Sequence, residues 1–112
     1  MRRGEIWWAA LDIPRGSEAG YRRPVAIVSS NLFNDTRLRS VLTIPVTSNL
    51  AREAIVGNVR LPGGRTGLPK PSVALAVQIG KTDKRCLVGQ IGRVPDAIMS
   101  QIDDALRLVL AL

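Results

Sequence analysis

Two short stretches of this 112-residue sequence hold side chains that together can bind a phosphate group. Arg22 and Arg23 stand immediately before Pro24, at the start of an apolar, β-branched run that predicts a buried strand. A guanidinium binds phosphate oxygens through two parallel N–H groups, and proline fixes the backbone φ where this strand begins. Thr47 and Ser48 end a second predicted strand, and the hydroxyl of Thr47 can donate to the same ligand.

The two stretches are expected to form an antiparallel hairpin. Apolar and polar residues alternate along residues 40–48, and the loop 31–39 is centred near Asp35. In that register paired residue numbers sum to about 70, which places Arg23 opposite Thr47 with Cβ atoms ~5 Å apart. A bulge at Pro45 would shift the pairing by one residue.

A glycine-containing loop precedes the arginines and adds a carboxylate. Gly16 and Gly20 flank Ser17 and Glu18, and glycine lets a loop lie close to a ligand. Arginine is a poor base because its reference pKa lies above about 12. We therefore expect Glu18 to handle a proton and Arg23 to supply charge.

Charge favours a polyanionic partner. The net charge is +7, and the last 17 residues hold three acids and one base, so residues 1–95 carry 15 bases against 6 acids, a net of +9. Arginine outnumbers lysine 13 to 3, which favours bidentate contacts with phosphate or carboxylate. The partner is expected to be a nucleic acid or an acidic protein.

Several catalytic classes are excluded by composition. The chain has no histidine and one cysteine, Cys86, and its carboxylates do not form a metal-ligand pattern, so no metal and no cofactor is expected. RNA cleavage remains open to such a chain, because the 2′-hydroxyl attacks the neighbouring phosphate without a metal. The protein then aligns the attack, moves a proton and stabilises the phosphorane, roles that Arg23, Thr47 and Glu18 can fill.

Length and the lone cysteine set the remaining bounds. We expect residues 1–112 to form a single domain, because this length suffices for one modest core. One cysteine forms no internal disulfide, which fits a reducing compartment, and no apolar run reaches the ~20 residues that cross a bilayer. A cytoplasmic protein without a membrane partner is expected.

Short strands followed by one helix predict the fold class. Adjacent Trp7 and Trp8 must face opposite ways in the first strand, so one is expected in the core and the other on the surface. The further expected elements are a strand 54–61 bulged at Gly57, a loop 62–71, a strand 72–79, a helical turn 82–87 capped by Thr82, a strand 88–94 and a helix with Pro95 in its first position. This order predicts a mainly β (α+β), SH3-like small β-barrel of five to seven strands with a C-terminal α-helix packed against it.

The order of motifs along the whole chain resembles the MazF/PemK family of toxin endoribonucleases from type II toxin–antitoxin systems. The motifs that carry the resemblance are Arg3 to Trp7, Gly16 to Glu18, Arg23-Pro24, Ile44 to Ser48, Gly67-Leu68, Ser72-Val73, Gln78-Ile79, Asp83-Lys84, Ile91-Gly92 and Asp103 to Leu106. Each motif alone is weak, and the ordered set is specific.

The resemblance implies a homodimer that cleaves single-stranded RNA at a specific sequence, leaving a 2′,3′-cyclic phosphate and a 5′-hydroxyl. It also implies inhibition by a cognate antitoxin whose disordered C-terminal segment covers the RNA groove. In the family the active-site pair maps to Arg23 and Thr47, and the arginine is given a part in proton transfer, where chemistry alone favours Glu18. The residues predicted to bind RNA are Ser17, Arg22, Ser48, Arg65 and Gln78.

Departures from the family pattern keep the base preference open. Pro71 and Val77 stand where many members carry acidic residues, and Gly80 replaces a frequent basic or bulky residue.

Two alternatives remain: a CcdB-like DNA gyrase inhibitor, which would act through the terminal helix, and a non-catalytic nucleic-acid-binding barrel, in which Arg23 would contribute binding alone.

Overall fold

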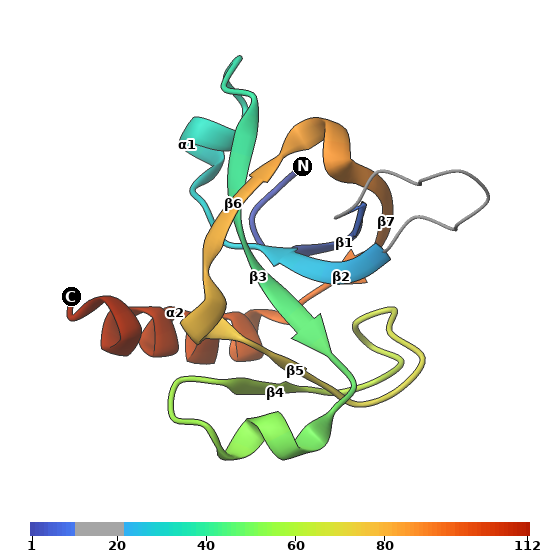
Figure 1. Cartoon of the computed structure of the whole chain (residues 1–112), viewed down its shortest axis with the longest axis vertical. Helices are drawn as coiled ribbons and strands as arrows, with labels where there is room; N and C mark the ends of the chain where they lie inside the picture. Colours follow the sequence, from blue (N-terminus) through green and yellow to red (C-terminus); the bar gives the residue numbers. More distant parts are fainter. Residues whose placement is uncertain (11–21) are drawn as a thin grey trace, which may run out of the picture.

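The computed structural model describes residues 1–10 and 22–112, and these form a curled antiparallel sheet with a helix against one face (Figure 1). The strands are β1 (Glu5–Ala10), β2 (Arg22–Ile27), β3 (Ser40–Thr47), β4 (Val59–Leu61), β5 (Ser72–Ala74), β6 (Gly80–Asp83) and β7 (Leu87–Arg93). The helices are α1 (Asn31–Asn34), α2 (Asp96–Leu110) and the 3₁₀ turns η1 (Leu50–Ala54), η2 (Ala76–Gln78) and η3 (Lys84–Cys86).

One long strand, β3, joins two parts of the sheet. The strand order is β4-β5-β3-β2-β1-β7, and β6 pairs with the other end of β3. Because β3 pairs in turn with β6, β2 and β5 along its length, the sheet curls strongly without closing. The predicted fold class, a small SH3-like β structure of five to seven strands with a C-terminal helix, is confirmed.

The register of the β2–β3 hairpin is the predicted one. Val25 pairs with Pro45, Ala26 with Ile44 and Ile27 with Thr43, so each pair of residue numbers sums to 70. No bulge shifts the pairing at Pro45. The loop between the strands contains α1, whose N-cap Ser30 accepts a hydrogen bond from the Leu32 amide.

Alternation along the strands divides the apolar residues between two clusters. The larger lies under α2 and includes Ile6, Ile44, Val46 and Leu61, all at most 2% exposed. The smaller lies on the other face of the hairpin and contains Ala9, Val25, Ile27, Val41 and Leu87, with Trp7 packed against it. As predicted, the tryptophans separate: Trp7 joins a core, and Trp8 is 40% exposed.

Helix α2 packs on the sheet, as predicted, and does so through an apolar stripe. Ile102, Ala105 and Leu106 are buried in the larger cluster, and Ile98 and Val109 pack against it. Pro95 is the N-cap residue rather than the first helical residue, and its carbonyl accepts hydrogen bonds from the amides of Ile98 and Met99. None of the helices in residues 1–10 and 22–112 is long and apolar enough to cross a bilayer.

The predicted strand 54–61 is wrong over its first half. Only Val59–Leu61 is a strand, because Gly57 has φ +94° and turns the chain between the carbonyl of Ile55 and the amide of Asn58. Val56 is 76% exposed as a result. Apolar composition suggested a strand here, and the turn geometry at glycine overrode it.

Two further elements differ from expectation. The predicted strand 72–79 ends at Ala74, and Ala76–Gln78 is a 3₁₀ turn that leaves Gln78 exposed. The helical turn near residue 84 is capped by Asp83, whose side chain accepts from the Arg85 amide. Thr82 belongs to β6, where its hydroxyl bonds that of Thr43 at 2.8 Å.

Candidate active site

The predicted pair, Arg23 and Thr47, lies where the β2–β3 ladder ends. That ladder stops at Val25 and Pro45, after which Val46 and Thr47 pair with β5 while Arg23 pairs with Ala9 of β1. We call this place, between the start of β2 and the end of β3, the fork. Its shape follows from β3 exchanging one partner strand for another.

Arg23 and Thr47 share a face and are half-buried. Alternation along β2 and β3 puts both on the face of Val25 and Ile27, because the hairpin register holds up to its last pair. The hydroxyl oxygen of Thr47 accepts a hydrogen bond from the Asn49 amide at 3.2 Å, which leaves its proton available to a ligand. The strand backbones therefore hold a guanidinium and a hydroxyl at one end of the sheet.

A pocket of about 220 Å³ lies on the other face of the fork. Pro24, Val46 and Ser48 line it from β2 and the end of β3, each next in sequence to a member of the predicted pair. Its remaining walls are Trp8, Leu68, Pro69, Lys70 and Ser72. The fork thus places the Arg23–Thr47 pair and a mainly apolar pocket on opposite sides of the same strand ends.

The loop 62–71 forms one wall of this pocket because it is packed directly on β7. A Cβ atom on Gly67, which has φ +84°, would collide with the carbonyl of Ile91, and one on Gly92 would collide with the carbonyl of Thr66. Thr66 is fully buried, and its hydroxyl donates to the carbonyl of Pro62 at 2.7 Å. Backbone contact therefore fixes a loop that is rich in glycine and proline.

The structure brings some of the predicted RNA-binding residues to the fork and leaves others elsewhere. Ser48 lines the pocket, and Arg22 is exposed at the start of β2. Gln78 is exposed on η2 and is not among the residues that line the pocket. Ser17 and Glu18 lie outside the described residues.

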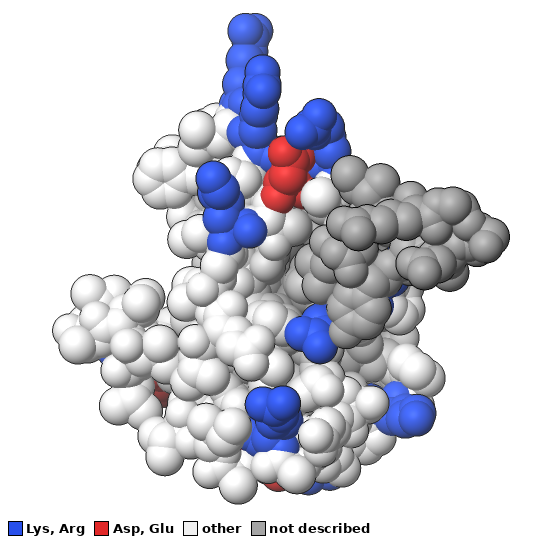
Figure 2. Space-filling view, in the orientation of Figure 1, with Lys and Arg blue, Asp and Glu red and all other residues white. Residues whose placement is uncertain are grey.

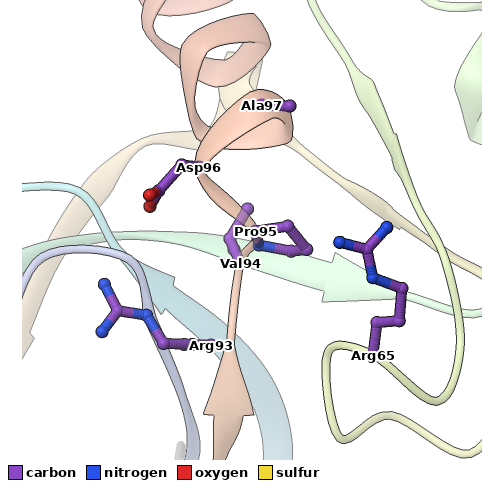
Figure 3. A pocket seen from close by; sticks show the side chains of 6 residues that line it. All are labelled: Arg65, Arg93, Val94, Pro95, Asp96 and Ala97. Atoms are coloured by element: carbon purple, nitrogen blue, oxygen red, sulfur yellow. The ribbon is translucent and has the colours of Figure 1, made fainter.

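Arg65 lines a different hollow, of about 580 Å³, at the start of α2. Figure 3 shows Arg65 and Arg93 on either side of Pro95, with the Asp96 carboxylate beside the first turn of the helix. The loop 62–71 thus contributes Arg65 to one hollow and Lys70 to the other. The contact of Arg65 with RNA remains a prediction.

Sequence reasoning missed three residues that line the pocket: Trp8, Lys70 and Ser72. The signal for Trp8 was its pairing with Trp7 in one strand, which required one exposed indole, although not which one. Lys70 and Arg65 are both bases of one loop, and nothing in their spacing indicates which lies beside Pro24. Only the packing of the loop on β7 decides this.

The described acidic residues with lowered pKa values lie away from the pocket. Burial alone would raise the pKa of Glu5, but hydrogen bonds from the Arg2 amide and the Trp7 indole, with nearby positive charge, outweigh it and lower the pKa. Hydrogen bonds from the side chain and backbone of Arg85 lower the pKa of Asp83. Among the described residues no three His, Cys, Asp or Glu side chains cluster as they would around a metal ion.

The described residues thus form a curled seven-stranded sheet with a C-terminal helix, and Arg23 and Thr47 lie at the open end of its central hairpin. The family model described as "PemK-like, MazF-like toxin of type II toxin-antitoxin system" matches residues 2–110. The chain belongs to this family.

Known proteins are similar to this chain over its whole length. The chain is 44% identical to Endoribonuclease MazF9 of Mycobacterium tuberculosis, with 100% of this chain and 98% of the relative covered. It is 30% identical to Endoribonuclease EndoA of Bacillus subtilis, with 100% and 96% covered. The solved structure of a mycobacterial endoribonuclease in complex with its cognate antitoxin superimposes with a TM-score of 0.80 at 27% identity, covering 100% of this chain and 96% of that chain.

Proposed function

We propose that this chain, a toxin endoribonuclease of the PemK/MazF family, cleaves single-stranded RNA at the fork without a metal ion, at a specific short sequence. The observation that carries the proposal is the position of Arg23 and Thr47, half-buried on one face where the β2–β3 ladder ends. Polyanionic RNA matches the net charge of +7.

The reaction follows from the groups at the fork. The 2′-oxygen attacks the adjacent phosphorus, the P–O5′ bond breaks, and the products are a 2′,3′-cyclic phosphate and a 5′-hydroxyl. The proton that leaves the 2′-hydroxyl goes to a base, and the leaving 5′-oxygen takes up one proton. The guanidinium of Arg23 stabilises the extra negative charge on the phosphorane, and the Thr47 hydroxyl donates to a phosphate oxygen. We assign the base to Glu18, since a guanidinium releases its proton too reluctantly at neutral pH.

The pocket on the other face of the fork supports the choice of a single-stranded substrate. An unpaired RNA strand that passes over the strand ends can place one phosphate beside Arg23 and Thr47 and a neighbouring base against the exposed indole of Trp8 on the other face. Ser48 offers a hydroxyl for a base edge, and Lys70 offers charge for the next phosphate. A base held in a duplex cannot enter this pocket.

The proposed partners follow from the family and its solved relatives. One relative is a complex of an endoribonuclease with its cognate antitoxin. For this chain we propose an antitoxin whose disordered C-terminal segment covers the fork and so competes with RNA. We also propose a homodimer, and activity in the cytoplasm, where the RNA substrates are.

The test is cleavage of a long single-stranded RNA in excess EDTA by the wild-type protein and by Arg23→Ala, Arg23→Lys and Arg52→Ala. Wild type and Arg52→Ala, which changes an exposed arginine on η1, are expected to cut at one recurring sequence. The cleavage rate of Arg23→Ala is expected to fall about 10³-fold. That of Arg23→Lys, which keeps the charge but loses the planar guanidinium, is expected to fall about 10²-fold.

The cut ends identify the chemistry. Polynucleotide kinase should label the new 5′ ends without prior phosphatase treatment, because they carry hydroxyls. Full activity of a folded Arg23→Ala protein would refute the proposed role of Arg23. Intact RNA with folded wild-type protein would refute the nuclease, and a supercoiling assay would then test gyrase inhibition.

A further inference from the structure

A second basic surface lies at the opposite end of the β2–β3 hairpin from the fork. Blue side chains gather at the end of the molecule where α1 meets the beginning of β3 and the end of β6 (Figures 1 and 2). We call this surface the tip; its bases are Arg37, Arg39, Lys81, Lys84 and Arg85. Because β3 has eight residues, the tip lies about 23 Å from Thr47 along the strand.

The tip is hollowed as well as basic. A cavity of about 480 Å³ lies between the segment after α1 and the turn η3, and it is lined by Thr36, Arg37, Leu38, Arg39, Asp83, Lys84 and Arg85. These basic residues come from two segments more than 40 positions apart in sequence. Tertiary structure, rather than a run of like charges, assembles the surface.

The bases of the tip divide into two kinds. Lys84 donates to the carbonyls of Asn34 and Thr36 at 2.9 and 3.0 Å and so ties η3 to the end of α1. Arg85 is paired with Asp83 at 3.2 Å. Arg37 and Arg39 are exposed and have no ion pair within the described residues. Two guanidiniums therefore face solvent, the exposed Lys81 adds a further positive charge, and Lys84 and Arg85 stabilise the surface.

Each of the described acids near the tip already has an ion-pair partner other than Arg37 and Arg39. Asp83 accepts from the amide, Nε and Nη2 of Arg85, and these hydrogen bonds, with a smaller contribution from the nearby charge of Arg39, hold the pKa of Asp83 below its ordinary value. Asp35 is paired with Arg2. Exposed arginines beside acids that already have partners attract an outside anion, and a guanidinium binds phosphate bidentately.

We propose that the tip is a second RNA-binding surface, which holds the phosphate backbone of a long substrate away from the cleavage site. This rests on the proposed function, because that function supplies a polyanion long enough to reach from the fork to the tip. Phosphate contacts carry no base information, so the tip raises affinity for long RNA and leaves the cleavage sequence to the fork.

Substrate length separates the two surfaces. An RNA of about five nucleotides centred on the cut extends too little on either side to cover the ~23 Å from the fork to the tip, whereas an RNA of about 40 nucleotides covers it. The variant is Arg37→Gln with Arg39→Gln. The control is Arg52→Gln with Arg107→Gln, which removes the same charge from exposed positions elsewhere. Cleavage of both RNAs is measured at several salt concentrations.

The tip variant is expected to raise KM about tenfold for the long RNA and to leave kcat/KM for the short RNA unchanged. The salt dependence of binding to the long RNA should fall by about 1.4 in log–log slope, since each lost phosphate contact with a single strand contributes about 0.7. The control should change KM for the two RNAs alike. Equal effects of the tip variant on both RNAs, or none on either, would overturn the proposal.

A binding measurement keeps the inference separate from the proposed nuclease. The long RNA is prepared with 2′-O-methyl groups, so it lacks the attacking hydroxyl, and its Kd is compared between wild type and the tip variant. Weaker binding by the variant supports the tip whether or not the protein cleaves RNA. Unchanged RNA binding together with weaker binding of an acidic antitoxin peptide would assign the tip to that partner and overturn the RNA proposal.

Discussion

The two ends of the β2–β3 hairpin are built differently. At the fork, Val46, Leu68 and Ser72 are at most 5% exposed, and the loop 62–71 touches β7 backbone to backbone. At the tip, Lys84 and the Arg2–Asp35 pair hold the chain through polar contacts at the surface. Packing holds side chains within a narrow range, as catalysis requires, whereas diffuse attraction of a polyanion requires charge alone.

The largest effect that this contrast predicts is loss of the hydroxyl at the fork. Thr47→Val keeps the shape and strand preference of the residue but removes a donor to the developing phosphorane, so cleavage should slow by about 10²–10³-fold. Thr43→Val makes the same change in the same strand nearer the tip; it removes a hydrogen bond to Thr82 rather than a contact with substrate, so the folded variant should cleave at about the wild-type rate. The measurement is the single-turnover cleavage rate of each variant. A near-wild-type rate for Thr47→Val would show that the hydroxyl has no part in the mechanism.

A side chain added where the loop 62–71 packs on β7 should give the next largest effect, a loss of stability. Gly92→Ala puts a Cβ against the carbonyl of Thr66, where backbone cannot yield easily, so unfolding free energy should fall by about 2–3 kcal/mol. In the control Gly80→Ala the new Cβ would lie 3.8 Å from the carbonyl oxygen of Gln78, so the free energy of unfolding should change by under about 1 kcal/mol. Urea unfolding of both variants measures the difference, and equal stabilities would show that the loop is not held by this contact.

A smaller effect is expected from the exposed indole of the pocket. Trp8→Ala should weaken binding of a short single-stranded RNA about tenfold, and Trp8→Phe should retain most of the affinity, because one stacked base contributes about 1–3 kcal/mol. Leu42→Ala removes a similarly exposed apolar side chain on the tip side of β3. Fluorescence anisotropy gives the three Kd values, and the stacking role fails if both alanine variants bind alike.

The smallest effect concerns the N-terminal segment. Glu5 accepts from the Arg2 amide at 2.8 Å and the Trp7 indole at 3.0 Å, so Glu5→Gln should cost about 1 kcal/mol of stability at pH 7. The folded-state pKa of Glu5 is lowered, so its stabilisation is complete above the unfolded value near 4.5 and is lost as pH falls through the folded value.

The difference between wild type and Glu5→Gln should therefore close in acid. Asp104→Asn, which alters an exposed pair with Arg107, serves as the control and should change stability by less than about 0.5 kcal/mol at either pH. Denaturant unfolding at pH 7 and below pH 4 tests this, and a gap that stays constant would contradict the linkage.

Alternation and helical periodicity were enough to predict the hairpin register, the terminal helix and the positions of Arg23 and Thr47 at adjoining strand ends. These features depend on residues close in sequence, where a period of two or 3.6 determines which side chains share a face. The same local rules failed at Gly57 and at Ala76–Gln78, where the backbone turns although the composition is apolar.

Tertiary structure alone decided what surrounds the hairpin. Trp8 rather than Trp7 became the exposed indole because β1 lies between β2 and β7, with Trp7 facing the smaller cluster. Lys70 rather than Arg65 came to the fork because Gly67 and Gly92 let the loop pack on β7. The tip joins segments distant in sequence, and such contacts depend on how strands and loops pack in three dimensions rather than on any local period.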